Sequence, residues 1–193
     1  MNIVGLDCLR FGVEDIASCM RYLTDYGLHP VDTGDAGGQF EAMDGTCVEI
    51  RAAADAALPA QMATGCKLRQ TVYGVASERE LDRIANELAK DREVARNADG
   101  AVECADDMGF ALSFQKTVRR PYQARAELIN SPGAAAQRAV NQTAADSHAV
   151  IVPRTLSHVV YFVPDVAKAE AFYVDRLGFR VSDRFLGVGP FLR

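Results

Sequence analysis

One histidine in this sequence is not explained by the secondary structure around it. Residues 156–163 are apolar or β-branched apart from Ser157 and His158, which is typical of a buried strand. Strand alternation puts His158 on one face with Val160 and Phe162. An imidazole on such a face either binds a metal ion or hydrogen-bonds a backbone carbonyl as a core histidine. The residue types alone leave both interpretations open.

A glutamate in the first quarter of the chain is a second candidate, because carboxylates join imidazoles in many metal sites. Glu49 alternates with Val48 and Ile50 in a short apolar strand, so it faces the same side as Cys47 and Arg51. The alternative is an ion pair with Arg51 or exposure to solvent. We favour this alternative, since no convincing ligand set surrounds Glu49.

Composition excludes several classes of function. The 193-residue chain has 49% hydrophobic and 24% charged residues and a net charge of −5, which indicates a globular protein and no nucleic-acid partner. No segment is apolar enough to cross a membrane and the N-terminus lacks a basic stretch before an apolar run, so we expect a cytoplasmic location. The oligomeric state stays open, a homo-oligomer included. The cysteines show no C-x-x-C pair and are expected to be reduced thiols: Cys8, Cys19, Cys47, Cys66 and Cys104.

The candidate histidine opens a strand–helix–strand pattern that spans residues 155–183. After the strand at 156–163, Asp165 is a suitable N-cap, and apolar residues recur at helical spacing until Gly178 ends the helix. The next strand is predicted at residues 179–185. His158 is therefore expected on the first strand of a supersecondary unit.

Two earlier stretches repeat this pattern. Residues 1–52 and 66–118 each read as one strand, one helix and three further strands, the second helix opening on a capping-box signature at Ser77 and Glu80. Alignment of the copies places Cys8 and Gln70 where the last copy has His158. Three copies of a βαβββ unit are the strongest architectural signal in the sequence.

The predicted organisation is two modules, a connection and a third, incomplete module. Residues 1–118 form an N-terminal domain, residues 119–154 an inter-domain connection with a helix at 134–142, and residues 155–193 the start of a second domain. The intervals between the first and last strands of the earlier copies place the end of the third module beyond Arg193. We therefore expect residues 155–193 to be the least well-packed part of the structure.

A family resemblance adds to this pattern. The strings S-H-V-V-Y-F-V-P-D-V, A-F-Y and L-G-F-R-V-S-D resemble the opening βαβ of a vicinal-oxygen-chelate module, the superfamily of glyoxalases, bleomycin-binding proteins and extradiol dioxygenases. Within it, G-F-R-V-S-D and G-P-F-L-R most resemble the two-domain extradiol dioxygenases. The resemblance covers residues 155–193 and implies an α+β fold, in which tandem βαβββ modules pair into curved mixed sheets with the helices outside.

The resemblance also implies where a metal would bind, because ligands in the superfamily come from the first and fourth strands of paired modules. In the first two modules these positions are Cys8, Glu49, Gln70 and Ser113, which predicts a structural domain without a catalytic metal. In the second domain His158 matches the first of two histidines that bind Fe(II) together with a glutamate. The other ligands and the acid-base residue would lie beyond Arg193, so no catalytic residue can be assigned.

The expected function is therefore part of a metal-dependent extradiol dioxygenase that cleaves a catechol-like aromatic with O2. A single imidazole would not complete the site, so the chain alone is expected to be inactive. The cofactor alternatives are another divalent metal or none in these residues. The functional alternatives are a glyoxalase-like lyase or isomerase and a metal-free binding protein for an apolar small molecule.

Overall fold

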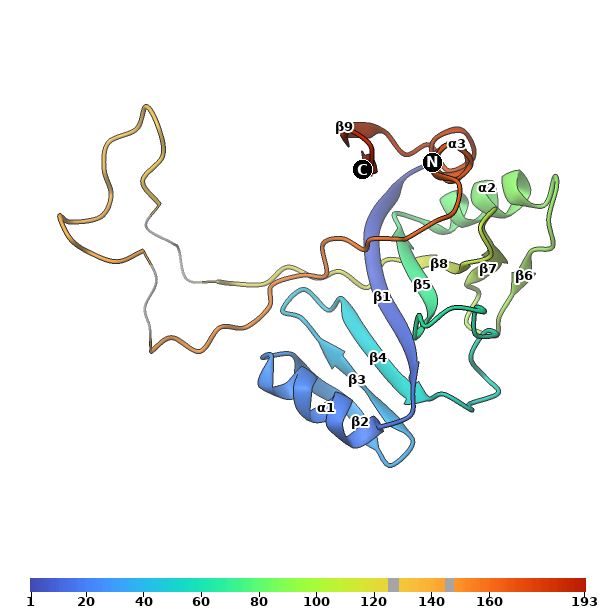
Figure 1. Ribbon diagram of the computed structural model, residues 1–193, viewed down its shortest axis with the longest axis horizontal. Coiled ribbons are helices and arrows are strands. Elements are labelled where there is room, and N and C mark those ends of the chain that lie inside the picture. Colours follow the sequence, from blue (N-terminus) through green and yellow to red (C-terminus); the bar gives the residue numbers. More distant parts are fainter. Residues whose placement is uncertain (125–128, 145–147) are drawn as a thin grey trace.

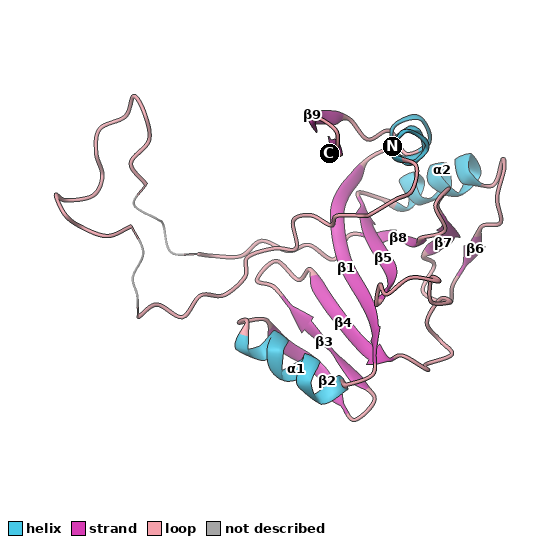
Figure 2. Cartoon of the chain, viewed as in Figure 1, coloured by secondary structure: helices cyan, strands magenta, loops and turns pink. Residues whose placement is uncertain are grey.

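A computed structural model describes residues 1–124, 129–144 and 148–193. Its main body is a curved eight-stranded mixed sheet with one helix on the outside of each half (Figures 1 and 2). The first half of the sheet contains β1 (Ile3–Val13), α1 (Ile16–Asp25), β2 (His29–Gly34), β3 (Gly37–Glu41) and β4 (Cys47–Ala52). The second half contains β5 (Leu68–Val75), α2 (Glu78–Leu88), β6 (Ala95–Arg96), β7 (Val102–Ala105) and β8 (Ala111–Lys116).

The sheet topology confirms the two predicted βαβββ modules. The strand order is β2-β3-β4-β1-β5-β8-β7-β6, so the first strand of each module lies at the centre of the sheet. There β1 and β5 pair antiparallel, while each also pairs parallel with the last strand of its own module, β4 or β8. The two modules therefore share one continuous hydrogen-bonded sheet.

Each helix covers its own half of the sheet through an apolar core. Beneath α1, Leu23 packs with Phe40 and Ile50, and beneath α2, Ile84 packs with Leu112 and Phe114. The strand alternation that sends these side chains toward the helices sends Cys8, Cys47 and Val72, a separate small cluster, to the opposite face. The face without helices is thus the one that carries the predicted ligand positions.

The N-cap predicted at Asp165 is confirmed, whereas the start predicted at Ser77 differs. The carboxylates of Asp15 and Asp165 accept hydrogen bonds from the amides of Ser18 and Lys168, as N-caps do. The capping box at Ser77 is wrong, because the Ser77 side chain makes no cap hydrogen bond. The Glu80 carboxylate instead accepts a hydrogen bond of 2.8 Å from the amide of Asn2.

The third unit consists of α3 (Val166–Ala171), a π-helical turn η1 (Phe172–Arg176) and an antiparallel pair, β9 (Val181–Phe185) and β10 (Gly189–Leu192). It lies beside α2 in Figure 1. The Arg176 guanidinium binds the carboxylates of Glu87 and Asp91 on that helix and its C-terminal end. Three of its side chains enter the core of the second module: Phe172, Tyr173 and Leu177.

This packing corrects the expectation that residues 155–193 are the least well packed. Phe172 and Leu177 are 2% and 1% exposed, because they fill the space between α2 and the edge of the second core. Other parts of residues 155–193 do have the open character that was expected, since Phe162 before α3 and Phe185 and Leu186 at the β9–β10 turn are largely exposed. The described residues between 121 and 152 are the more open part, and Figure 1 shows them as a long excursion from the body.

Two predicted elements are wrong. Residues 156–163 form no strand, because no neighbouring strand in the described chain supplies the ladder of hydrogen bonds that defines one. The segment still runs extended, with Val159, Tyr161 and Val163 against the core and Val160 and Phe162 exposed.

The second incorrect element is the helix at residues 134–142, which the structure replaces with turns. Parts of the predicted connection, residues 125–128 and 145–147, lie outside the described residues. The division into domains at residues 118 and 155 stays a prediction. No described helix is both long and apolar enough to span a bilayer.

The packing of the third unit predicts a difference between two leucine truncations. Leu177→Ala removes a side chain that is 1% exposed and should lower the free energy of unfolding by about 2–5 kcal/mol. The matched control is Leu186→Ala, where the side chain is 91% exposed and the change should stay within about 0.5 kcal/mol. Urea unfolding of both variants is the measurement, and equal stabilities would contradict the docking of this unit.

Candidate functional site

The candidate metal ligand His158 lies on the surface. Its side chain is exposed, and its Nδ1 atom is 3.0 Å from the hydroxyl oxygen of Ser157. Val160 and Phe162 are exposed as well, 68% and 93%, as expected for residues on the same face of an extended segment. The alternative of a core histidine is therefore wrong. An accessible imidazole can act as a ligand, but the metal role of His158 stays a prediction.

The described residues do not complete a metal site around this histidine. They contain no group of three or more His, Cys, Asp or Glu side chains placed to hold a metal ion. An iron site of the expected kind needs two imidazoles and one carboxylate. The donor set in the described chain therefore does not fit that site by itself, and His158 would supply one ligand of three.

The four ligand positions of the first two modules are brought near one another by the central strands. In the register of the sheet, Cys8 is opposite Cys47, and Arg10 is opposite both Glu49 on β4 and Gln70 on β5. These neighbours share the face without helices, as the alternation predicts. The structure thus forms the place where the resemblance would put a first metal.

A guanidinium occupies that place. The Nε atom of Arg10 donates to Oε2 of Glu49 at 2.7 Å, and its Nη1 atom donates to Oε1 of Gln70 at 2.6 Å. The other carboxylate oxygen of Glu49 accepts a 2.6 Å bond from Nε of Arg51. Both oxygens of Glu49 are therefore bound to cations of the chain, which confirms the expected ion pair and goes beyond it.

Arg10 is a residue that the sequence analysis missed. Its signal was available, because Arg10 is two residues after Cys8 and so shares its face, opposite the strands that carry Glu49 and Gln70. A charged residue inside an apolar strand at the centre of a sheet needs a partner. The pairing of modules, once predicted, could have supplied that partner.

The thiols at this place are poor ligands. Cys8 and Cys47 are both 6% exposed and both free, as are the other three cysteines. The pKa of the Cys8 thiol lies well above its ordinary value, because it hydrogen-bonds Cys47 and because burial disfavours the thiolate. A metal ligand must be the thiolate, so the raised pKa of Cys8 favours a structural role.

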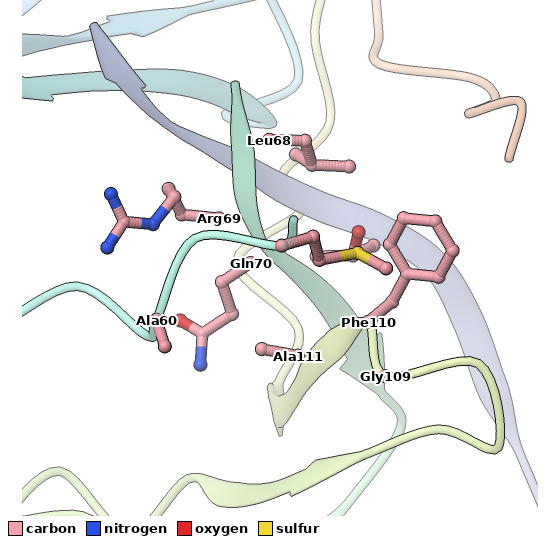
Figure 3. A pocket seen from close by; sticks show the side chains of 9 residues that line it. Ala60, Leu68, Arg69, Gln70, Gly109, Phe110 and Ala111 are labelled. Atoms are coloured by element: carbon pink, nitrogen blue, oxygen red, sulfur yellow. The ribbon is translucent and has the colours of Figure 1, made fainter. Parts of the chain in front are cut away.

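The space beside Gln70 is too small for a substrate. The pocket in Figure 3 lies between β5 and the start of β8, and its lining includes Gln70, Phe110 and Met62. Its volume is about 10 Å³, roughly the room for one water molecule. Small-molecule sites are usually clefts of about 300–1,000 Å³, so this pocket is no substrate site.

A buried polar network joins the third unit to the second module. The hydroxyl of Tyr173 donates to Oδ2 of Asp106 at 3.0 Å, and the hydroxyl of Tyr161 donates to that of Thr71 at 2.5 Å. Burial raises the pKa of Asp106, although it accepts hydrogen bonds from the amides of Phe110 and Met108 and from the Tyr173 hydroxyl. Burial likewise raises the pKa of Tyr161 to about 12, so its phenol stays neutral.

The arginine network predicts that Glu49 is structural. Glu49→Ala should leave the amount of divalent metal bound by the protein unchanged, since Glu49 already binds Arg10 and Arg51. It should lower the free energy of unfolding by about 1–3 kcal/mol, because Arg10 loses its carboxylate partner in a partly buried place. Metal analysis after dialysis and urea unfolding test both parts, and loss of metal in this variant would contradict the assignment.

The raised pKa of Asp106 predicts a pH dependence with a definite sign. Its folded pKa lies above the unfolded value of about 3.9, so the folded state binds the proton more tightly. Stability from this group is greatest below the unfolded pKa and is lost as the pH rises through the folded one. Asp106→Asn removes that loss.

The stability of Asp106→Asn relative to the parent should therefore increase from about pH 4 to pH 7. The measurement is urea unfolding of both proteins at the two pH values, with Asp99→Asn at an exposed turn as the control. A relative stability that is constant or decreases with pH would show that burial does not govern Asp106.

Comparisons with known proteins agree with this geometry. Residues 155–188 match a family described as bleomycin resistance protein-like N-terminal. The chain is 31% identical over 95% of its length to a biphenyl-2,3-diol 1,2-dioxygenase of Paraburkholderia xenovorans (strain LB400), of which it covers 57%. It thus spans little more than half of the curated relatives that it matches along its whole length.

Solved structures share the fold. The Mn(II)-bound glyoxalase from Novosphingobium aromaticivorans aligns with 100% of this chain and 58% of its own, with a TM-score of 0.69 and 19% identity. Homoprotocatechuate 2,3-dioxygenase from Arthrobacter globiformis aligns with 100% of this chain and 56% of its own, with a TM-score of 0.65 and 19% identity. By its tandem βαβββ modules and by these structural similarities, the chain has the vicinal-oxygen-chelate fold.

Proposed function

We propose that this chain is the N-terminal domain and the start of the second domain of an extradiol dioxygenase that cleaves a catechol-like aromatic with O2. The observation that carries the proposal is the sequence similarity to biphenyl-2,3-diol 1,2-dioxygenase, which runs through both modules and the third unit. Glyoxalases share the fold at similar TM-scores, so fold alone does not separate the two activities. The sequence similarity favours the dioxygenase.

The first two modules have a structural role in this proposal. Arg10 fills the place between Glu49 and Gln70 with a fixed positive charge, and the thiol of Cys8 is buried and neutral. Ser113, the remaining ligand position, is 1% exposed within the sheet. This arrangement stabilises the junction of the modules and offers no open coordination position.

The metal is proposed to be Fe(II), bound in the second domain with His158 as one ligand. The exposed imidazole of His158 supports this role. The described residues place no second and third ligand beside it, so the proposal takes the two further ligands from other residues. Bound iron would supply open positions for a catecholate and for dioxygen. The contribution of this chain to the site is one imidazole ligand. The proposal also includes a cytoplasmic location and a small aromatic substrate.

The proposal is tested on protein expressed from the longest reading frame that contains the chain. With Fe(II) added anaerobically and then air and biphenyl-2,3-diol, the parent should produce a ring-opened product, followed by its visible absorbance. His158→Ala should reduce iron affinity and ring opening by more than about 100-fold, above the loss typical of an outer-shell partner. The control His29→Ala changes an exposed histidine on β2 and should leave both unchanged.

Activity that survives in His158→Ala would overturn the ligand assignment. An inactive parent that binds iron yet opens no catechol would instead favour the glyoxalase-like alternative, which is assayed with a glutathione hemithioacetal.

The 193-residue chain gives a separate prediction. With a single imidazole of the three expected ligands, it should bind Fe(II) weakly and open no catechol ring. Iron titration followed by the same product assay is the measurement. Ring opening above the buffer rate would show that the described donor set suffices and that the assignment of His158 to an incomplete site is wrong.

A further inference from the structure

We propose that Arg119 and Thr46 form a latch, which fixes the backbone of Leu156 against the first two modules and so positions His158. The latch consists of these two side chains and the turn at residues 43–46 between β3 and β4. Its relevance to metal binding rests on the proposed function. The contact that the latch makes between the first two modules and residue 156 is independent of the proposed function.

The Arg119 guanidinium joins three segments that are distant in sequence. Its Nη2 atom donates to the carbonyl oxygens of Leu6 on β1, at 2.8 Å, and of Leu156, at 3.0 Å. Its Nη1 atom donates to Oδ2 of Asp44 and to the hydroxyl of Thr155, both at 2.9 Å. One planar cation thus bridges the central strand, the β3–β4 turn and the segment that leads to His158.

The amide side of Leu156 is held as well. Its N–H donates to the hydroxyl oxygen of Thr46 at 2.6 Å, while that hydroxyl donates to Oδ1 of Asp44 at 2.7 Å. Thr46 is fully buried, so the bond is shielded from water. Both backbone polar groups of Leu156 are therefore bound by latch side chains, one by Thr46 and the other by Arg119.

The turn extends this contact toward the connection. The amides of Met43 and Asp44 donate to the carbonyl oxygens of Pro153 and Arg154, at 3.0 and 3.1 Å. Further along, Gly27 has a φ of +96°, and a Cβ there would lie 2.4 Å from the carbonyl oxygen of Ile151. Described residues from 151 to 156 therefore lie tightly along the first module, although most of the connection does not.

The acidic partners of Arg119 are themselves fixed. The pKa of Asp44 is lowered: its burial alone would raise it, but hydrogen bonds from Thr46 and Thr155 and the charge of Arg119 outweigh that effect. Asp7 is fully buried, lies 4.0 Å from Nε of Arg119 and accepts bonds from Gln115, Thr117 and the amide of Val118. The chain leading into Arg119 is held by Asp7 through contacts that do not involve the third unit.

The position of the latch determines its consequence. His158 is two residues beyond Leu156 in an extended segment, a distance of about 7 Å along the chain. The side chain of Ser157 between them contacts His158 and is exposed. The latch is therefore the last fixed polar contact of the backbone before the imidazole, and Arg119 and Thr46 act as positioning residues without touching the metal.

The first experiment measures the latch alone in the 193-residue chain. Thr46→Val keeps the shape of the side chain but removes the acceptor, so amide hydrogen exchange at Leu156 should accelerate by about fivefold or more. Thr46→Ser keeps the hydroxyl and should restore slow exchange. The control Arg120→Gln, which breaks an ion pair with Glu41, should leave Leu156 unchanged.

Arg119→Gln should have the same effect as Thr46→Val, and Arg119→Lys should not rescue it, because an ammonium cannot reproduce the planar set of donors. Should Arg119→Gln fail to fold, Thr46→Val still decides the result. Unchanged exchange at Leu156 in Thr46→Val would overturn the proposal.

The second experiment measures positioning in protein from the longest reading frame, loaded with Fe(II). Thr46→Val should raise the Kd for Fe(II) by about tenfold, with an unchanged KM for biphenyl-2,3-diol at saturating iron, and Thr46→Ser should restore the parent Kd. A faster exchange with an unchanged Kd would overturn the positioning role. If the parent itself binds no iron, the proposed function fails, whereas the exchange experiment still decides whether the latch exists.

Discussion

The antiparallel pairing of β1 with β5 is the interaction on which the structure depends. Each of these strands also pairs parallel with the last strand of its own module, so the central pair makes one sheet from two βαβββ units. The pairing sends one set of side chains toward α1 and α2 and the other set to the open face. It therefore builds both apolar cores and also determines which polar residues meet between the modules.

Two arginines show how this junction is used. Arg10 lies on the open face between Glu49 and Gln70. Its guanidinium takes the position where a metal ion would otherwise bind these two side chains. Arg119 lies at the other end of β1, next to Leu6, and connects the sheet to the segment before His158. The first arginine fills the place between Glu49 and Gln70, and the second is proposed to position His158.

The modules could be predicted from sequence because their signals are local. The first strand of the second module, β5, is buried along its whole length and pairs with β1 and β8 on its two sides. Residues 156–163 are more apolar than β5 but form no strand, because a strand also needs a neighbour. The local composition of a segment indicates that it is buried, but it does not indicate which strand forms hydrogen bonds with it.

The contacts between distant segments could be predicted only in part. Arg10 could have been found by combining strand alternation with the predicted pairing of modules. Arg119 could not, because its partners Leu6, Asp44 and Leu156 share no pattern or spacing with it. The docking of Phe172 and Leu177 was missed for a similar reason, since an apolar helix face does not indicate which core it enters.

The central claim is that the first two modules hold no metal and that His158 belongs to the site that does. Its most direct test is anomalous diffraction at the iron edge from crystals of protein expressed from the longest reading frame and soaked with Fe(II) without oxygen. The account predicts an iron peak bonded to the imidazole of His158 and no peak between Glu49 and Gln70. An iron peak beside Glu49, with Arg10 displaced, would contradict it.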